Sequence, residues 1–407
     1  MKAASPKKSP DFLSESAQIL ERLQQPLAGV MRALGGIKKS GDLERMLGLD
    51  RTLAWQLVKV AESTDPLENA ANVPSRVSIE RFVQGAQSLG VSSDLTTPLL
   101  AAHEQFESLV ARHAGDRVCF NTMVSAAGKG EQWHAKELQH RRNVFRGMSH
   151  MLGVQAGLLL RSSFVRRLAS DPDKVEAICI GGVSNLRLLR ETERINIYQS
   201  RVFRQLEDGV SYHSNIERTN VYGNEEIDGY RLSDFCTSRD AQCEMIHGES
   251  GWIYGNLLNG AIGATGESSH YFGTRYYNIP HPAGREGQFA TRLHIDLPVK
   301  VYIADEFIEP GFADDWIAQA SAMVGSSASD RAAPPGIERT LPCRMDFECL
   351  GQGPPPAIKE FPDYPEMVRH VADHSGFDLS DYQCWRLRVE YPLYGSTIMS
   401  EFVEPRS

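Results

Sequence analysis

The spacing of apolar residues changes once along the 407-residue chain, and this change restricts the possible folds more than any other feature. In the first half, apolar positions recur every three or four residues, as in residues 99–115, which is typical of amphipathic helices. Beyond about residue 193 they alternate. In RLHIDLPVKVYI (292–303) every second residue from Leu293 is apolar, which predicts a strand with one buried face. Pro298 within it indicates an edge strand or a bulge.

We therefore predict an α+β multidomain chain. Its N-terminal half is all-α and contains a helix-turn-helix, and its C-terminal half is mainly antiparallel β with a few helices. Helices are expected at residues 78–91, 99–115, 131–169, 312–325 and 364–376, and further strands at 194–203, 269–279, 344–350 and 384–393. The predicted domains are a disordered arm (1–12), a helix-turn-helix domain (13–120), a long-helix connector and dimerisation region (121–190) and an acidic β-rich domain (191–407).

Charge is divided unevenly between the two halves of the chain. Residues 1–204 contain 28 Lys and Arg against 21 Asp and Glu, a net charge of +7, whereas residues 205–407 contain 15 against 31, a net charge of −16. A basic segment is compatible with phosphate contacts, and an acidic one is repelled by DNA. The charge pattern therefore favours different partners for the two halves.

A two-helix motif lies in the basic half, in KKSGDLERMLGLDRTLAWQLVK (38–59). Gly48 suits the tight turn between two short helices, since such turns often need a positive φ. Asp50 can cap the second helix. The buried positions at fixed offsets around the turn are all apolar, namely Leu43, Leu47, Leu49, Ala54 and Leu57. The pattern predicts a helix-turn-helix packed on one face.

The opposite face of the second helix has side chains suited to DNA. Arg51, Thr52 and Gln56 can form hydrogen bonds with base edges. Lys38, Lys39 and Lys59 can contact phosphates. Residues 38–62 resemble the helix-turn-helix of bacterial transcriptional regulators. This resemblance implies double-stranded DNA as the partner, a role in transcription regulation, and a C-terminal domain that binds an effector or oligomerises.

Specific operator binding by such a module normally needs a homodimer with two recognition helices about one DNA turn apart. The apolar run MLGVQAGLLL (151–160), inside an arginine-flanked helix, is a candidate dimer seam, although an ordinary buried helix face explains it equally well. Helical hairpins with a glycine turn also occur in domains that bind nothing. A structural or assembly protein, whose helical half has no nucleic-acid partner, is therefore a separate hypothesis.

A metal-dependent enzyme is the hypothesis from another class. His294 and Asp296 alternate onto one face of a predicted strand, and a later His370 completes the ligand set of the two-His-one-carboxylate site that holds non-haem iron. The chain has no GxSxG, Walker or GxGxxG motif, so the sequence favours a non-enzymatic function without a cofactor.

The N-terminal residues and the cysteine spacing predict the cellular location. Seven cysteines without CxxC spacing do not indicate a disulfide framework, and MKAASPKKSP has no apolar signal core. No apolar run is long enough to span a membrane. We therefore expect a cytoplasmic protein without a membrane partner.

Overall fold

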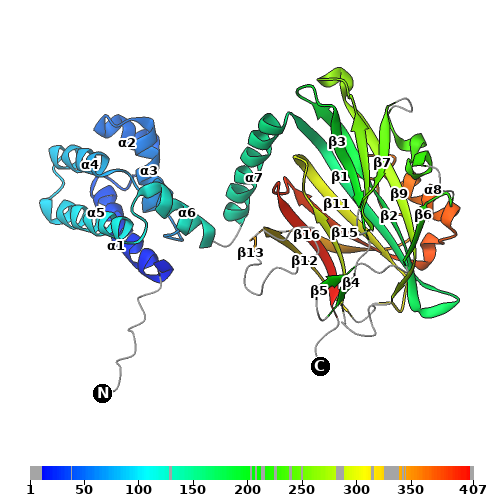
Figure 1. The fold of residues 1–407 in the computed structure, drawn as a ribbon. Coiled ribbons are helices and arrows are strands. Elements are labelled where there is room, and N and C mark those ends of the chain that lie inside the picture. Colours follow the sequence, from blue (N-terminus) through cyan, green and yellow to red (C-terminus); the bar gives the residue numbers. More distant parts are fainter. Residues whose placement is uncertain are drawn as a thin grey trace, which may run out of the picture. The chain divides into compact units, whose positions relative to one another are not determined.

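The computed structural model divides into two units between Trp133 and His134. It describes residues 12–37, 39–127, 131–201, 204–206, 209–211, 216–223, 227–237, 241–248, 251–280, 288–312, 316–324, 339–341, 343 and 345–403. The helical N-terminal half and β-rich C-terminal half predicted from the sequence are confirmed (Figure 1). The predicted disordered arm at residues 1–12 lies almost entirely outside the described residues.

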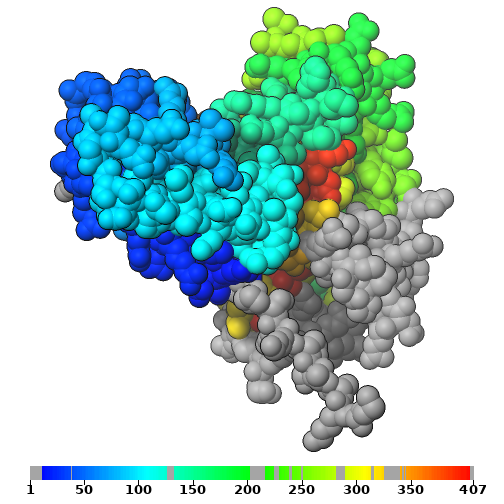
Figure 2. Space-filling model, turned by 90° about the vertical axis from the view of Figure 1, so that its left-hand side faces the viewer, coloured from blue at the N-terminus to red at the C-terminus, as the bar shows by residue number. Residues whose placement is uncertain are grey.

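The first unit is built from helices around one apolar core. Its elements are α1 (Phe12–Ala33), α2 (Ser40–Leu47), α3 (Arg51–Ala61), the short η1 (Ala70–Asn72), α4 (Arg76–Ser88), α5 (Ser93–His113) and α6 (Arg117–Ala127). The predicted helices at 78–91 and 99–115 correspond to α4 and α5, and the hydroxyls of Ser75 and Ser92 cap them. Leu27, Leu57, Phe82 and Phe106 are fully buried in the shared core. In the space-filling view these helices, blue to cyan, pack closely together (Figure 2).

The predicted long helix at residues 131–169 is wrong beyond residue 152. Helix α7 (Glu131–Leu152) begins before the division between the units and ends at Gly153, whose φ of +70° is unsuited to a continuing helix. The chain then continues as strand β1 (Val154–Leu168). The candidate dimer seam at 151–160 is therefore wrong as well, because Ala156, Leu158 and Leu160 are buried in the interior of the second unit.

In the ranges that the structure describes, the second unit contains three larger sheets, one of which is covered by helix α8. Its strands are β1, β2 (Asp171–Leu188), β3 (Arg194–Ser200), β4 (Arg204–Leu206), β5 (Gly209–Ser211), β6 (Glu217–Asn220), β7 (Cys243–His247), β8 (Ile253–Leu258), β9 (Ser268–Pro280), β10 (Gln288–His294), β11 (Val299–Ile308), β12 (Ile317–Val324), β13 (Arg339–Thr340), β14 (Asp346–Gln352), β15 (Gln383–Glu390) and β16 (Ser396–Val403). Its helices are α8 (Tyr364–Ser375) and the short η2 (Ile227–Tyr230), η3 (Ser233–Phe235), η5 (Ala264–Gly266) and η7 (Leu379–Asp381).

The largest sheet has seven strands in the order β14-β15-β11-β1-β2-β9-β6. Its neighbouring strands are antiparallel except for β1 and β11, which run parallel. One face packs against α8, where Met367 and Val368 meet Leu158 and Phe307. The opposite face packs against the sheets β10-β16-β12-β13 and β3-β8-β7. The central strands are thus covered on both sides.

Two predictions in the second half need correction. The segment 292–303 is not one strand, because β10 ends at His294 and β11 begins at Val299, with Pro298 in the connection. The alternating residues Leu293 to Ile303 are nevertheless buried as predicted.

The predicted helix at 312–325 is also wrong, since Ile317–Val324 forms β12, paired along its length with β16. Pairing with a neighbouring strand has overridden the helix propensity of this alanine-containing segment.

No helix in the described ranges is both long enough and apolar enough to cross a membrane.

Candidate nucleic-acid interface

Helices α2 and α3 form the two-helix turn expected from the sequence. Gly48, between them, has φ +61° and ψ 30°, a left-handed conformation that ends α2. Asp50 precedes α3, and its carboxylate Oδ1 accepts a hydrogen bond from the Leu53 backbone N–H at 2.8 Å. The predicted turn and the predicted cap are therefore both present.

The inner side of this motif is buried in the helical core. Leu43, Leu49, Ala54 and Leu57 are 0–4% exposed. The fifth predicted core residue, Leu47, is half-buried and lies against α4. The apolar offsets around Gly48 thus determine which face of α3 turns inward.

Helix α4 supports the turn from outside the motif. Arg81 donates a hydrogen bond from Nη2 to the carbonyl oxygen of Gly48 at 3.3 Å. Gly85 lies against Leu47, whose nearest side-chain atom is 3.4 Å from the position a Cβ would take. Nothing local in the sequence around Gly48 indicates Arg81, because the two residues are 33 positions apart.

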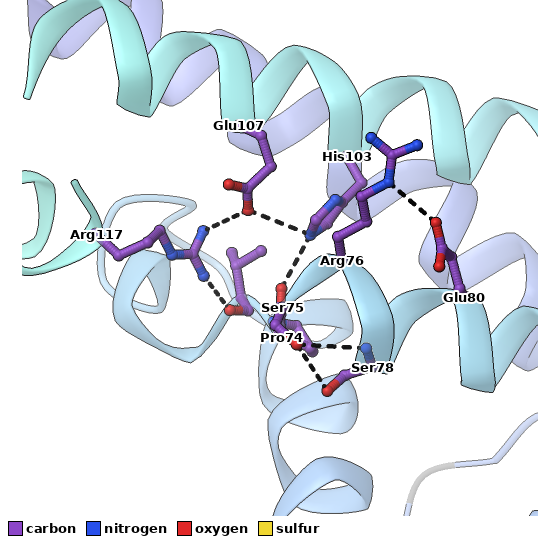
Figure 3. A network of polar contacts seen from close by, with 9 residues as sticks. Pro74, Ser75, Arg76, Ser78, Glu80, His103, Glu107 and Arg117 are labelled. Atoms are coloured by element: carbon purple, nitrogen blue, oxygen red, sulfur yellow. Dashed lines mark hydrogen bonds and ion pairs between the residues drawn. The ribbon is translucent and has the colours of Figure 1, made fainter. Parts of the chain in front are cut away.

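A polar network holds the segment that leads into α4 (Figure 3). The ring of His103 lies 2.9 Å from the carbonyl oxygen of Pro74 and 3.7 Å from a carboxylate oxygen of Glu107. Arg117 lies 3.6 Å from the same carboxylate and donates a hydrogen bond to the carbonyl of Val73. Burial lowers the pKa of Arg117, and Glu107 partly offsets this shift. The network joins α5 and α6 to the start of α4, so its role is to position the helix that supports the turn.

The outer side of α3 carries most of the predicted DNA-contacting residues. Arg51, Thr52 and Lys59 are exposed, and Gln56 is half-buried. Trp55 lies among them with 45% of its surface exposed. Of the predicted phosphate contacts before α2, Lys39 is exposed, whereas Lys38 lies outside the described residues. Within the part of the chain that the structure describes, Arg51 and Lys59 form no ion pair.

The division into units changes the interpretation of the charge pattern. Residues 1–133 contain 15 Lys and Arg and 15 Asp and Glu, so the sequence of the first unit is neutral. Residues 134–204 contain 13 and 6, which accounts for the whole excess of +7. The basic character of the first half of the chain therefore belongs to α7 and the first strands of the second unit. It does not support a general attraction of the α3 surface to DNA.

The alternative metal ligands do not form a site. His294 is at the end of β10, where its Nδ1 lies 3.3 Å from the Thr397 hydroxyl, and Asp296 follows the strand. His370 is on α8, where its ring contacts Phe235. Across the described ranges, no group of three or more His, Cys, Asp or Glu side chains is arranged to hold a metal ion. His294, Asp296 and His370 lie on different elements and are not brought together as the sequence suggested.

Comparison with known proteins adds no evidence about function. No protein-family model and no curated protein matches the chain. Among solved structures, it is similar to the crystal structure of a putative protease from Parabacteroides distasonis, with 10% sequence identity and a TM-score of 0.24. The alignment covers 62% of this chain and 41% of that chain. So low a TM-score carries no argument about fold or function.

Proposed function

We propose that the chain binds double-stranded DNA through α3 and acts as a transcriptional regulator. The observation that carries this proposal is the division of α3 into two faces. Leu53, Ala54 and Leu57 are buried, while Arg51 and Lys59 are exposed and form no ion pair with a described carboxylate. Arginine can bind guanine in the major groove through two hydrogen bonds, and lysine can contact phosphates. The second unit is proposed to bind an effector or to mediate oligomerisation.

The neutral charge of the first unit limits the affinity with which α3 alone can bind DNA. Non-specific affinity depends on the number of phosphates neutralised, and the sequence of this unit has no excess of cations over carboxylates. Specific binding would therefore depend on base contacts by α3 and on a second copy of the chain placing another α3 on the same site. Light scattering of the full chain, with and without its DNA, measures whether such a dimer forms.

The test begins by selecting binding sequences from a random duplex library with the full chain at low salt. The affinity of the enriched duplex is then measured for variants by fluorescence anisotropy. Arg51→Ala is expected to lose about 1–3 kcal/mol of binding free energy and to relax the sequence preference. Arg112→Ala is the matched control, because Arg112 is an exposed arginine of the same unit that is paired with Glu15 on α1.

The control should bind as the wild type does. If the selection enriches no sequence and the chain retains no duplex at low salt, α3 is not a DNA-binding helix. The structural or assembly hypothesis would then account for the helical unit. Equal losses for Arg51→Ala and Arg112→Ala would likewise contradict a specific role for α3.

A further inference from the structure

A polar cleft of about 590 Å³ lies at one end of the seven-stranded sheet in the second unit. Residues of β15, β11, β1 and β2 line it. These four strands are neighbours in the sheet (Figure 1). This volume lies in the range of small-molecule sites. The residues on which the argument depends are Asn185, Arg187, Lys300, Lys359, Arg388 and Tyr391.

Two of the four cations that line the cleft form no ion pair with a described carboxylate, although the charge of Lys359 also acts on the neighbouring Glu360. Arg187 is 2.5 Å from Glu267, and Arg388 is 2.9 Å from Glu360. Lys300 and Lys359 are exposed, and neither forms an ion pair with a carboxylate of the described ranges. The two arginines are thus already occupied, and the two lysines remain to bind an anion. Lysines without an ion pair are unexpected in this unit, because its sequence carries the chain's entire net charge of −9.

The backbone around the cleft has unusual conformations. Asn185 and Tyr391 have φ values of +52° and +46°, both in the left-handed region. This conformation is uncommon for residues other than glycine, and for an aromatic residue it is an outlier. Tyr391 is held there by a hydrogen bond from its N–H to the carbonyl oxygen of Lys300 at 2.7 Å. Backbone strain of this kind gathers at ligand-binding sites.

A glycine on β1 also shapes the cleft lining. A Cβ added at Gly157 on β1 would lie 2.9 Å from the Cβ of Asn185. Glycine is therefore required where β1 passes Asn185, and both residues line the cleft.

Helix α7 is attached directly to one wall of the cleft. Arg141 donates a hydrogen bond from Nη1 to the carbonyl oxygen of Glu390 at 2.6 Å. The ring of Phe145 contacts the ring of Tyr391, with centroids 5.5 Å apart. Glu390 and Tyr391 both line the cleft. A molecule bound there would meet the residues that hold α7 to the sheet.

We infer that this cleft binds a small anionic molecule through its carboxylate or phosphate oxygens, and that the bound molecule tightens the attachment of α7. Lys300 and Lys359 supply the charge, and Asn185 supplies an amide for other polar groups of the ligand. Neither part of this inference rests on the proposed function, because neither involves α3.

The experiment titrates the full chain calorimetrically with inorganic phosphate and, separately, with citrate at constant ionic strength. At least one probe is expected to bind with one-to-one stoichiometry, and Lys300→Gln and Lys359→Gln should each weaken that binding about fivefold. Lys174→Gln is the matched control, because Lys174 lies on β2 outside the cleft lining and is paired with Asp171. Binding of phosphate alone assigns a phosphoryl ligand, and binding of citrate alone assigns a carboxylate ligand.

Hydrogen exchange at residues 141–152 tests the second part of the inference. The bound probe should slow exchange there. Arg141→Ala should abolish this slowing while changing the affinity for the probe by less than about twofold. Two results would overturn the inference: neither probe binds, or all three lysine variants bind like the wild type. Neither measurement uses DNA, so a negative result in the α3 experiment does not affect this one.

Discussion

The buried carboxyl of Glu306 should make the stability of the second unit depend on pH. Glu306 is on β11, is 1% exposed, and accepts a hydrogen bond from the Ser400 hydroxyl at 2.8 Å. Burial raises its pKa from 4.5 to about 7, since Arg161 and the neighbouring hydroxyls offset only part of the cost of desolvation. The folded state therefore holds this proton more tightly than the unfolded state. The resulting stability is complete below pH ~4.5 and is lost as the pH rises through ~7.

Replacing Glu306 with glutamine removes this dependence while leaving an oxygen that can accept the Ser400 hydrogen bond. A shift from 4.5 to about 7 corresponds to about 3 kcal/mol, so Glu306→Gln should gain roughly that much relative to the wild type between pH ~5 and ~8. Urea unfolding followed by fluorescence measures the difference, in a background where Trp55 and Trp133 are phenylalanine and the remaining tryptophans report on the second unit. Glu348→Gln, at an exposed position on β14, is the control. A Glu306→Gln difference that stays constant over this pH range would refute the reasoning.

Two further pairs of substitutions test the backbone conformation at Gly48 and the buried charge of Asp305. Gly48→Ala should destabilise the first unit by about 1 kcal/mol, because φ is +61° and nothing within 4 Å would contact the new Cβ. Gly29→Ala, within α1 and equally uncrowded, should instead stabilise it by about 0.5–1 kcal/mol, and thermal shifts of the same sign would contradict this account. Arg386→Ala should destabilise the second unit by about 3 kcal/mol in urea, because it leaves the carboxylate of Asp305, which is 0% exposed, without its cation. Arg45→Ala, at a side chain 79% exposed, should change stability by less than about 0.5 kcal/mol, and equal losses for the two arginine variants would contradict the role of burial.

The two helices around Gly48 could be predicted because the interactions that define them are local. Gly48 ends α2, and Asp50 caps α3 through a residue three positions away. The inward face follows from the apolar period of α3 itself. What supports the turn could not be predicted in this way. The hydrogen bond from Arg81 and the contact with Gly85 depend on how α4 packs, and no short-range pattern records that packing.

The sequence predicts a helix over β1 and places β2 in the all-α half because both strands are covered on both faces. Leu158 faces α8, while its neighbour Leu159 faces the other sheets, so both are buried and the alternation disappears. A strand buried on both faces appears in sequence as a continuous apolar run, which periodicity alone cannot distinguish from a buried helix. Gly153 was the available signal, since glycine commonly follows the last turn of a helix.

The charge pattern was also interpreted before the boundary between the two units was known. A net charge of +7 over residues 1–204 appeared to belong to a DNA-binding half, yet the excess lies wholly within residues 134–204. That segment supplies Arg187, which lines the cleft, and Arg141, which binds the cleft wall from α7. Lys300, Lys359 and Arg388 join them only after the chain has folded, from positions more than 100 residues further along. Charge therefore has to be assigned to a surface after the units are known, and here the basic excess does not lie on the unit that carries α3.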